Sequence, residues 1–344
     1  MRVAELIAPR RFRLVEGQTG EPGAGEVQVR VRAVGICGSD LHNFSEGGIG
    51  DRPCLFPMVL GHEPAGTVLK TGAGVTGWAP GDTALLEPAL YCYHCEFCAT
   101  GRHNLCVNMR FLSNPGAPGF FREVVTLPAK NLLPVPPGVG LAAATLFEPL
   151  AVVLHSMKFA RPERGETAAV YGCGPIGLLT VAVLALSGAG RIFAVDPVAH
   201  RREMALALGA ACALDPSAGA PSAEIGRATG QRGADLAIDC AAKADSTNEC
   251  LRALRPGGRL VLTGIPSEVL VPLELHVMRR KEIALFNVHR SNHETGEAAE
   301  LLREHPARFG SIVTHQRPLE QVEAAFSMLE RYDDGVGKVV IDLS

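Results

Sequence analysis

Several features are scarce in this sequence of 344 residues, and each shortage excludes a class of protein. Aromatic residues make up only 5% of the chain, which argues against a large, flat apolar ligand. The net charge is −3 and no run of Lys and Arg stands out, so we expect no nucleic-acid partner. We find no uncharged run of about 18 apolar residues that could span a membrane, and the first residues lack the apolar core of a signal peptide. We therefore expect a cytoplasmic protein without a membrane partner.

Cysteine, by contrast, is plentiful: the chain contains ten. Thiols in the cytoplasm are expected to stay reduced, because that compartment works against disulfides. A cluster of cysteines there indicates a set of metal ligands before it indicates a disulfide framework. The length of the chain suits two domains better than a single core.

The residue pattern changes along the chain and predicts an α/β protein. Residues 1–150 read as β-rich, and EVQVRVRAVG (26–35) alternates as a half-buried strand does. Residues 141–160 read as a helix with a break expected at Pro149. From residue 167 strands and helices alternate, which predicts a doubly wound parallel sheet.

We place this second domain at 151–290. Residues 291–344 are expected to return to the first domain, so that the parallel sheet is an insertion between two parts of the other domain.

The segment VYGCGPIG follows a predicted strand and opens a predicted helix, which is the context that a dinucleotide-binding G-x-G-x-x-G motif requires. Its glycines let the backbone approach a pyrophosphate, and the helix start presents free N–H groups to that anion. The residues predicted to contact the cofactor here are Gly172, Gly174, Pro175, Ile176 and Gly177.

Asp196 ends the next predicted strand, about twenty residues further on. A carboxylate at that place binds the ribose hydroxyls and repels a 2′-phosphate, so NAD is favoured over NADP. Arg201 and Arg202 stand close by, and a basic neighbour could accommodate a phosphate. We expect Asp196 and Arg201 to contact the cofactor.

The run CYHCEFCATGRHNLC carries Cys92, Cys95, Cys98 and Cys106. Four thiolates form a closed tetrahedral shell around zinc and leave no position for a substrate, so this set indicates a structural site. An iron–sulfur cluster also takes four cysteines, but the spacing differs from the bacterial cluster motif. We call residues 88–110 the four-cysteine lobe.

A second set of metal-ligand residues is scattered along the chain. A thiol, an imidazole and one or two carboxylates make a mixed-ligand site, which can leave a place open for substrate. Each residue alone is unremarkable, and spacing alone does not show that they converge. The set consists of Cys37 in GICGSDLH, His62 and Glu63 in GHEPAG, and Glu148 in FEPLAV.

These motifs, taken in order with the four-cysteine run and GCGPIG, resemble the zinc-dependent medium-chain dehydrogenases over essentially the whole chain. The resemblance is strongest to the polyol branch, which includes sorbitol and L-idonate dehydrogenases. HRSNHETGEAAELL and VTHQRPLEQVEAAF are similar to the C-terminal pattern of that branch. The resemblance implies a GroES-like catalytic domain, an inserted Rossmann domain and a homodimer or homotetramer.

The resemblance also implies two zinc ions per chain and roles for particular residues. Catalytic zinc would be held by Cys37, His62 and Glu63, with Glu148 bound directly or through water. Structural zinc would be held by the four-cysteine lobe. In such enzymes a serine, here Ser39, passes the substrate proton through the ribose hydroxyls to a histidine, here His42. A secondary alcohol of a polyol, sugar or cyclitol would then give a hydride to NAD.

Phe111 and Arg290 match positions that contact polyols in sorbitol dehydrogenases, together with Ser39 and Glu148. A buried arginine paired with a core carboxylate is the alternative for Arg290. L-threonine 3-dehydrogenase and sugar-phosphate dehydrogenase remain alternative activities. A zinc-free NADP-binding quinone reductase or structural protein is the alternative from another class.

Overall fold

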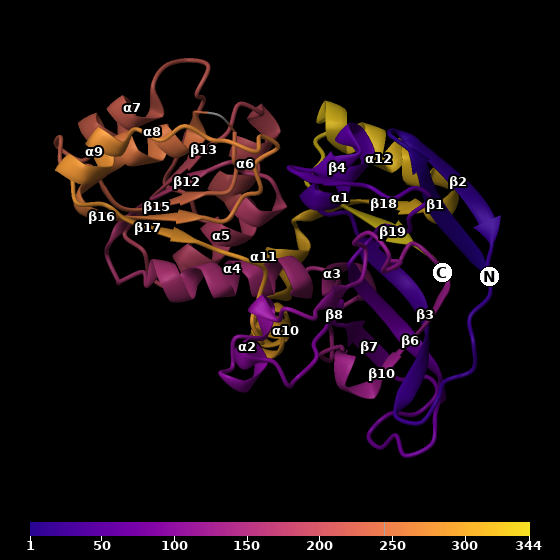
Figure 1. The fold of residues 1–344 in the computed structure, drawn as a ribbon. Coiled ribbons are helices and arrows are strands. Elements are labelled where there is room, and N and C mark those ends of the chain that lie inside the picture. The colour runs from indigo at the N-terminus through magenta and orange to yellow at the C-terminus, as the bar shows by residue number, and fades with distance from the viewer. Residues whose placement is uncertain (244) are drawn as a thin grey trace. The chain divides into compact units, whose positions relative to one another are not determined.

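The computed structural model describes residues 1–243 and 245–344 (Figure 1). The chain divides into two compact units. The first unit combines Met1–Glu148 with Asn292–Ser344, and the second unit is Pro149–Ser291. The first unit is therefore built from both ends of the chain. The architecture agrees with the predicted fold class, a β-rich unit with an inserted α/β unit.

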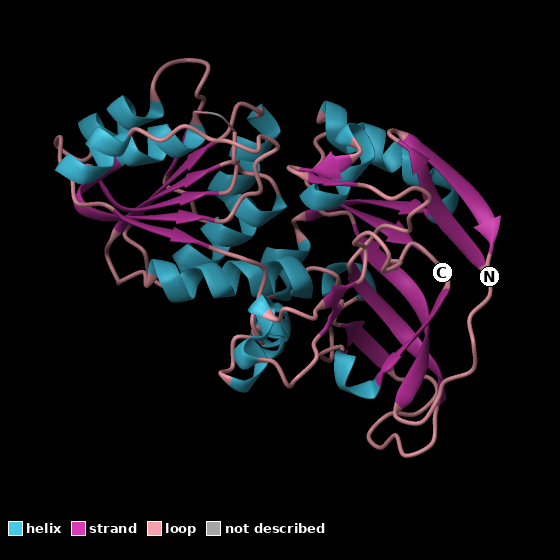
Figure 2. Ribbon diagram, in the orientation of Figure 1, coloured by secondary structure: helices cyan, strands magenta, loops and turns pink. Residues whose placement is uncertain are grey.

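A seven-stranded sheet forms the centre of the first unit (Figure 2). Its path is β11-β7-β6-β3-β19-β18, and β10 pairs with β3 off this path. The strands of this sheet are β3 (Glu26–Gly35), β6 (Glu63–Thr71), β7 (Thr83–Leu86), β10 (Val124–Pro128), β11 (Leu132–Pro134), β18 (Val313–Pro318) and β19 (Lys338–Asp342).

Shorter pairs and helices complete the first unit. The paired strands are β1 (Arg2–Ala8) with β2 (Arg11–Glu16), β4 (Gly48–Ile49) with β5 (Arg52–Pro53), and β8 (Ala89–Leu90) with β9 (Arg110–Phe111). The helices are α1 (Gly38–Glu46), α2 (Glu96–Ala99), α3 (Leu141–Ala144), α10 (Thr295–Glu304), α11 (Pro306–Gly310) and α12 (Val322–Arg331), with 3-10 turns at His103–Leu105, Ala129–Asn131 and Leu319–Gln321.

The predicted strand 26–35 is β3, an inner strand of the seven-stranded sheet. Its apolar residues are buried, and the strand lies inside the sheet, between β6 and β19. Gly35 lies opposite Glu63 in the β3–β6 register and opposite Val340 in the β3–β19 register. The last strand of the chain, β19, is thereby brought beside the motif that begins at Gly35.

The second unit is a six-stranded parallel sheet with helices around it (Figure 2). The strand order is β14-β13-β12-β15-β16-β17, which is the doubly wound arrangement that the alternating pattern predicts. The strands are β12 (Thr167–Tyr171), β13 (Arg191–Val195), β14 (Cys212–Leu214), β15 (Ala234–Asp239), β16 (Leu254–Leu262) and β17 (Ala284–Asn287); the helices are α5 (Pro175–Leu186), α6 (Ala199–Ala207), α7 (Pro221–Ala228), α8 (Ser246–Ala253) and α9 (Leu275–Arg280).

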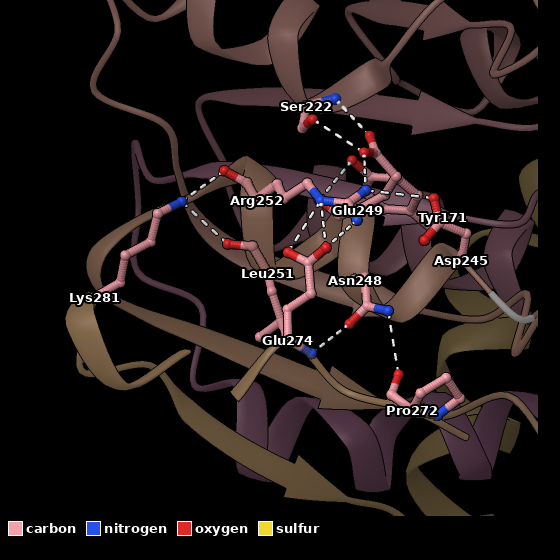
Figure 3. Close-up of polar contacts among 10 residues, drawn as sticks. All are labelled: Tyr171, Ser222, Asp245, Asn248, Glu249, Leu251, Arg252, Pro272, Glu274 and Lys281. Carbon is pink, nitrogen blue, oxygen red and sulfur yellow. Dashed lines mark hydrogen bonds and ion pairs between the residues drawn. The ribbon is translucent and has the colours of Figure 1, made fainter. Parts of the chain in front are cut away.

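Polar contacts fasten α8 to its neighbours (Figure 3). Lys281 donates to the carbonyl oxygens of Leu251, Arg252 and Leu254 at 3.1, 2.6 and 2.6 Å, so its ammonium caps the carboxyl end of the helix. The Arg252 guanidinium binds Glu274 and also Glu249. These contacts hold α8, α9 and the start of β16 together.

Residues Leu141–Ala160 are long and apolar enough to cross a membrane, with a mean hydropathy of 1.2. Their apolar window is 67% buried, as in the core helix of a soluble protein. The break predicted at Pro149 instead falls between α3 and α4 (Phe147–Ala160), four residues earlier at Thr145. Pro149 is tolerated because it lies in the first turn of α4, where a backbone N–H has no helical partner to lose.

Candidate functional site

Three residues of the scattered set converge in the first unit. Cys37 lies between β3 and α1, and His62 and Glu63 lie at the start of β6. One ligand atom from each residue lies within 4.8 Å of the others. The β3–β6 pairing explains this convergence, because it sets Gly35 opposite Glu63. A Cβ at Gly35 would collide with the Glu63 carboxylate, so the motif needs glycine there.

A buried carboxylate orients His62. Asp40 Oδ1 lies 3.3 Å from His62 Nδ1 and also accepts hydrogen bonds from Ser113 Oγ (2.9 Å) and the Gly61 backbone N–H (3.2 Å). Burial disfavours the charged forms, but the ion pair outweighs it, so the pKa of Asp40 is lowered and the pKa of His62 is raised. A carboxylate on one ring nitrogen leaves the other, Nε2, for a metal ion.

A buried lysine from the far end of the chain pairs with Glu63. Lys338 Nζ lies 2.7 and 2.6 Å from the two carboxylate oxygens of Glu63 and 3.0 Å from the Ile36 carbonyl oxygen. Both side chains are buried, at 1% and 0% exposure. Burial opposes the charge on Lys338, but Glu63 and Cys37 outweigh it and raise the pKa of the ammonium. Lys338 therefore fixes the position of the Glu63 side chain at the edge of the donor set.

Glu148, in the first turn of α4, stands outside the group of three whose ligand atoms lie within 4.8 Å of one another. It is buried, and burial raises the pKa of its carboxyl to about 7, with Glu63 and Glu87 adding to the effect and His62 opposing it. The Glu148 carboxyl therefore interacts electrostatically with His62 and Glu63 of the donor set. Such a carboxyl can take up or release a proton near neutral pH.

Ser39 and His42 lie on α1, directly after Cys37. Ser39 Oγ is 3.5 Å from His62 Nε2, the ring nitrogen that faces away from Asp40. His42 Nδ1 is 3.0 Å from Glu46 Oε1 in a partly exposed pair. Because residues three apart on a helix share a face, Ser39 and His42 can lie on one line from the buried site toward solvent.

Phe111 is buried, and its ring centroid lies 5.4 Å from that of His62. It therefore forms an apolar wall beside the donor set. Arg290 belongs to the second unit, on the stretch that follows β17, and its backbone φ is 59°.

The four-cysteine lobe brings its thiols together as predicted. The ligand atoms of all four lie within 4.8 Å of one another, and the Cys92 sulfur is 3.9 Å from that of Cys98 and 3.5 Å from that of Cys106. Four sulfurs bound to zinc at ~2.3 Å stand ~3.8 Å apart, so these separations fit the ion. A hydrogen bond from the backbone N–H of His94 and further N–H donors lower the pKa of Cys92 to about 5, which favours the thiolate that zinc binds.

The glycine motif of the second unit forms the turn between β12 and α5. Gly174 is the N-cap of α5 and Pro175 is its first residue, where a missing N–H costs nothing. Gly177 packs against the strand end so closely that a Cβ would collide with the Gly172 carbonyl oxygen. The helix start is thus left open to an anion, as a pyrophosphate requires.

Asp196, directly after β13, is hydrogen-bonded to the backbone of the glycine loop. Its Oδ2 accepts the backbone N–H of Cys173 at 2.7 Å and its Oδ1 accepts that of Val198 at 2.8 Å. Arg201 approaches Gly174, since its Nη1 lies 3.8 Å from where a Cβ on that glycine would be. Arg202 Nη1 lies 3.1 Å from Asp215 Oδ2 and also donates to the Asp196 carbonyl oxygen at 2.8 Å.

Comparison with known proteins decides the family. Residues 23–137 match the alcohol dehydrogenase GroES-like domain, and residues 175–304 match the zinc-binding dehydrogenase domain. Sorbitol dehydrogenase of Bacillus subtilis (strain 168) is 32% identical over 92% of this chain and 90% of its own length. The chain belongs to the zinc-dependent medium-chain dehydrogenases.

Two solved structures share the fold at 28% identity. An alcohol dehydrogenase from Escherichia coli CFT073 complexed with NADH has a TM-score of 0.90 and covers 100% of this chain and 99% of its own. A zinc-binding dehydrogenase from Sinorhizobium meliloti 1021 bound to NADP also has a TM-score of 0.90, with 99% and 98% covered. As a zinc-dependent medium-chain dehydrogenase, the chain is an oxidoreductase that uses zinc and a nicotinamide dinucleotide.

Sequence reasoning missed two residues of this dehydrogenase's site. Asp40 lies inside the quoted motif GICGSDLH, and an acidic residue in the first turn of a helix after a metal-binding cysteine could have suggested its role. Lys338 gave no local signal, because it lies 275 residues from Glu63 and its strand reads as an ordinary buried one.

Proposed function

We propose that this chain moves a hydride between a secondary alcohol of a polyol, sugar or cyclitol and NAD. The observation that carries the proposal is the convergence of Cys37, His62 and Glu63 into one donor set beside Ser39. Three protein ligands leave a tetrahedral zinc ion with an open position for an alcohol oxygen. The likeness to a sorbitol dehydrogenase supports a polyol as substrate.

When bound, zinc lowers the pKa of an alcohol hydroxyl, and NAD accepts the hydride. The chain's own residues orient the reactants and remove the proton. Asp40 holds the His62 ring, and Lys338 holds the Glu63 carboxylate. Ser39 accepts the proton of the substrate hydroxyl while its own hydroxyl proton moves on toward His42, which releases a proton to solvent.

Glu148 serves as an additional ligand or as a proton acceptor near the metal. Its raised pKa lets it change charge as the site changes charge. Phe111 walls the substrate pocket beside His62. Arg290 binds the hydroxyls that neighbour the reacting carbon, because its guanidinium offers five N–H donors in a fixed plane.

Asp196 makes NAD the preferred cofactor. Its two backbone hydrogen bonds fix the carboxylate at the end of β13, and a fixed negative charge there repels a 2′-phosphate. Replacing Asp196 with Ala should shift the ratio of kcat/KM values from NAD toward NADP. An unchanged ratio would show that Arg201 or another group sets the preference.

The central test is Cys37→Ala, with Cys212→Ala as the matched control because Cys212 lies in β14, outside both donor sets. We expect turnover to collapse in Cys37→Ala while NAD still binds, and to persist in the control. Metal analysis should give two zinc ions per wild-type chain and one in Cys37→Ala. Retained turnover in Cys37→Ala would contradict the zinc mechanism.

The substrate is found by screening a panel for NADH formation: sorbitol, xylitol, ribitol, myo-inositol, aldoses, a sugar phosphate, L-threonine and 2-butanol. Oxidation of a polyol supports the proposal. Preference for L-threonine or the sugar phosphate would assign one of the alternative activities. A chain without zinc that reduces quinones with NADPH would overturn the proposal entirely.

We also propose that the chain forms a homodimer or homotetramer in the cytoplasm. The strand β17 is the edge of the parallel sheet, and the segment before it exposes Val269, Leu270 and Leu275 at 68%, 86% and 61%. An exposed apolar segment of this kind suits contact with a second copy of the chain. Light scattering should give at least a dimer, and Leu270→Lys should lower the mass toward that of a monomer. The ten free thiols suit a reducing compartment.

A further inference from the structure

A buried carboxylate of the second unit lies at the same end of the parallel sheet as the glycine motif. Asp239 is the last residue of β15, and it pairs in register with Tyr171, the last residue of β12. The glycine motif follows β12 directly, and β12 lies between β13 and β15 (Figure 1). The Asp239 side chain is 2% exposed. Because a buried charge is costly unless it is paired, the partners of this carboxylate show what it does.

Four donors from the chain itself satisfy the Asp239 carboxylate. Its Oδ1 accepts the backbone N–H groups of Ala241 and Ala242, each at 3.0 Å. Its Oδ2 accepts the hydroxyls of Ser246 at 2.9 Å and Thr247 at 2.7 Å. The two backbone donors belong to the turn after β15, and the two hydroxyls belong to the first turn of α8. We call residues 240–242 the β15 turn.

The β15 turn packs directly against the glycine motif. The Cys240 backbone N–H donates to the last carbonyl oxygen of β12 at 2.8 Å. A Cβ on Gly172 would lie only 2.7 Å from the Ala241 backbone nitrogen, closer than such atoms come in proteins. On the other side, a Cβ on Gly264 would lie 2.8 Å from the Ala242 Cβ. The turn is thus wedged between two glycines, and a shift of the turn would displace Gly172.

The backbone of the β15 turn is strained. Ala242 has a φ of 47°, in the left-handed region that residues other than glycine rarely occupy. Such a residue persists only where the surrounding contacts fix it. Asp239 Oδ1 binds the backbone N–H of this same residue. Without the carboxylate, we expect the turn to relax toward an ordinary conformation.

The end of β13 holds the opposite side of the glycine motif. The Gly172 backbone N–H donates to the last carbonyl oxygen of β13 at 2.7 Å, and the Cys173 backbone N–H donates to Asp196 at 2.7 Å. The motif is therefore held between the ends of β13 and β15. A loop fixed in this way binds an anion more tightly than a mobile loop, because little ordering is left to be done on binding.

We propose that Asp239 is a positioning residue for the cofactor. By holding the β15 turn against Gly172, it keeps the glycine motif in the shape that binds the pyrophosphate. The carboxylate acts through the turn, since its oxygens are occupied by donors of the chain itself. The proposal depends on the nicotinamide dinucleotide that this family uses and is independent of which alcohol is oxidised.

The test measures the dissociation constants of NAD and of ADP-ribose for Asp239→Asn by calorimetry. Asparagine keeps the shape of the side chain but removes its charge and one of its two acceptor oxygens. We expect both dissociation constants to rise about tenfold, as loss of a hydrogen bond to a charged group does. The KM for NAD should rise in the same proportion, while kcat with the best alcohol of the panel changes little.

Asp235 provides a matched control because it lies near the other end of the same strand. It is also buried, at 5% exposure, and it accepts the Thr167 backbone N–H at 3.0 Å. It pairs in addition with Arg232 and Arg255, each at 2.6 Å. Asp235→Asn should lower the thermal stability of the protein and leave both dissociation constants unchanged.

A second substitution tests whether the strained backbone links the carboxylate to the motif. Glycine adopts a positive φ without a steric penalty, so Ala242→Gly lets the turn keep its shape with less help. In the Asp239→Asn background, Ala242→Gly should recover part of the lost affinity for NAD. Thr247→Val removes one donor and keeps the shape of the side chain, so it is the milder variant if Asp239→Asn fails to fold. It should raise both dissociation constants about twofold to fivefold.

Four results would overturn the proposal. Unchanged dissociation constants in Asp239→Asn, or in Thr247→Val if the first does not fold, would show that the carboxylate does not shape the motif. An equal loss of affinity in Asp235→Asn would show general damage to the unit. Weaker binding of NAD with unchanged binding of ADP-ribose would place the effect at the nicotinamide end. No recovery on adding Ala242→Gly would show that the carboxylate does not act through the turn.

Discussion

Replacing Lys338 with Met tests how the buried ion pair supports the site. The substitution keeps an unbranched side chain of similar length and removes the ammonium. Glu63 is 0% exposed, and its two oxygens then lose the cation that lies 2.6 and 2.7 Å away. The carboxylate must remain buried without that partner or take up a proton.

Breaking a buried pair by removing one partner costs about 3–5 kcal/mol. We expect that loss in the free energy of unfolding of the metal-free protein, since Glu148 adds a second buried carboxyl to the same site. The double variant Lys338→Met with Glu63→Gln should recover most of the loss, because no uncompensated charge remains. Zinc should also recover part of it in Lys338→Met, since a dication replaces the lost positive charge.

Trp78 provides a specific assay. It is the single tryptophan of the chain, and it packs against the hydrophobic core of the first unit. The Lys338–Glu63 ion pair belongs to the same unit. Denaturant unfolding followed by tryptophan fluorescence therefore reports on that unit. The control is Arg303→Met, which removes the Arg303–Glu300 pair with side chains 45% and 54% exposed. Exposed pairs contribute about 0–1 kcal/mol, so the control should change little.

Two results would refute the reasoning. A loss below about 1 kcal/mol in Lys338→Met would place the pair among ordinary surface pairs. A double variant as unstable as the sum of its single substitutions would show that the two side chains are not coupled.

Three further predictions concern the remaining contacts. Asp40→Asn should weaken zinc binding at His62 about tenfold to a hundredfold, measured by competition with a chelator, because the ring loses the carboxylate that orients it. In the folded protein the pKa of Glu148 is about 7, above the ordinary value of a glutamic acid. Between about pH 5 and 8 the folded metal-free protein therefore keeps a proton on Glu148 that the unfolded chain has lost. The free energy of unfolding should fall as the pH rises through this range. Thermal unfolding with and without Glu148→Gln checks this, since the glutamine variant should lack that slope. Lys281→Met should destabilise the second unit by about 1–2 kcal/mol, seen as faster hydrogen exchange in α8, because three carbonyl oxygens lose their donor.

The parts of the fold that sequence predicts well are those set by local pattern. The alternating segment 26–35 is β3, and the glycine motif lies between β12 and α5 as its context requires. The predicted helix break is misplaced because the prediction treats proline as a helix breaker, whereas Pro149 lies in the first turn of α4, which tolerates proline. The contacts that hold α8 could not be predicted, since Lys281 acts on carbonyl oxygens about thirty residues away.

The candidate site divides in the same way. The four-cysteine lobe is contained in fifteen residues, so its spacing alone predicts a metal shell. The set of Cys37, His62 and Glu63 depends on strand register, and no spacing in the sequence records that Gly35 faces Glu63. Only resemblance to a family could bring those three together before the structure was known.

The four-cysteine lobe and the set of Cys37, His62 and Glu63 differ in which groups balance their negative charge. This difference explains why residue spacing predicts the first site and does not predict the second. Thiolates in a short loop near solvent need only the metal itself. The half-buried Cys37 and the buried Glu63 and Glu148 gather negative charge in one place, where an unpaired buried ion is costly. Lys338 offsets part of that charge from β19, the strand that closes the first unit. The chain must therefore complete its fold at its far end before the site near its beginning is stable, and that dependence spans too many residues for a local motif to record.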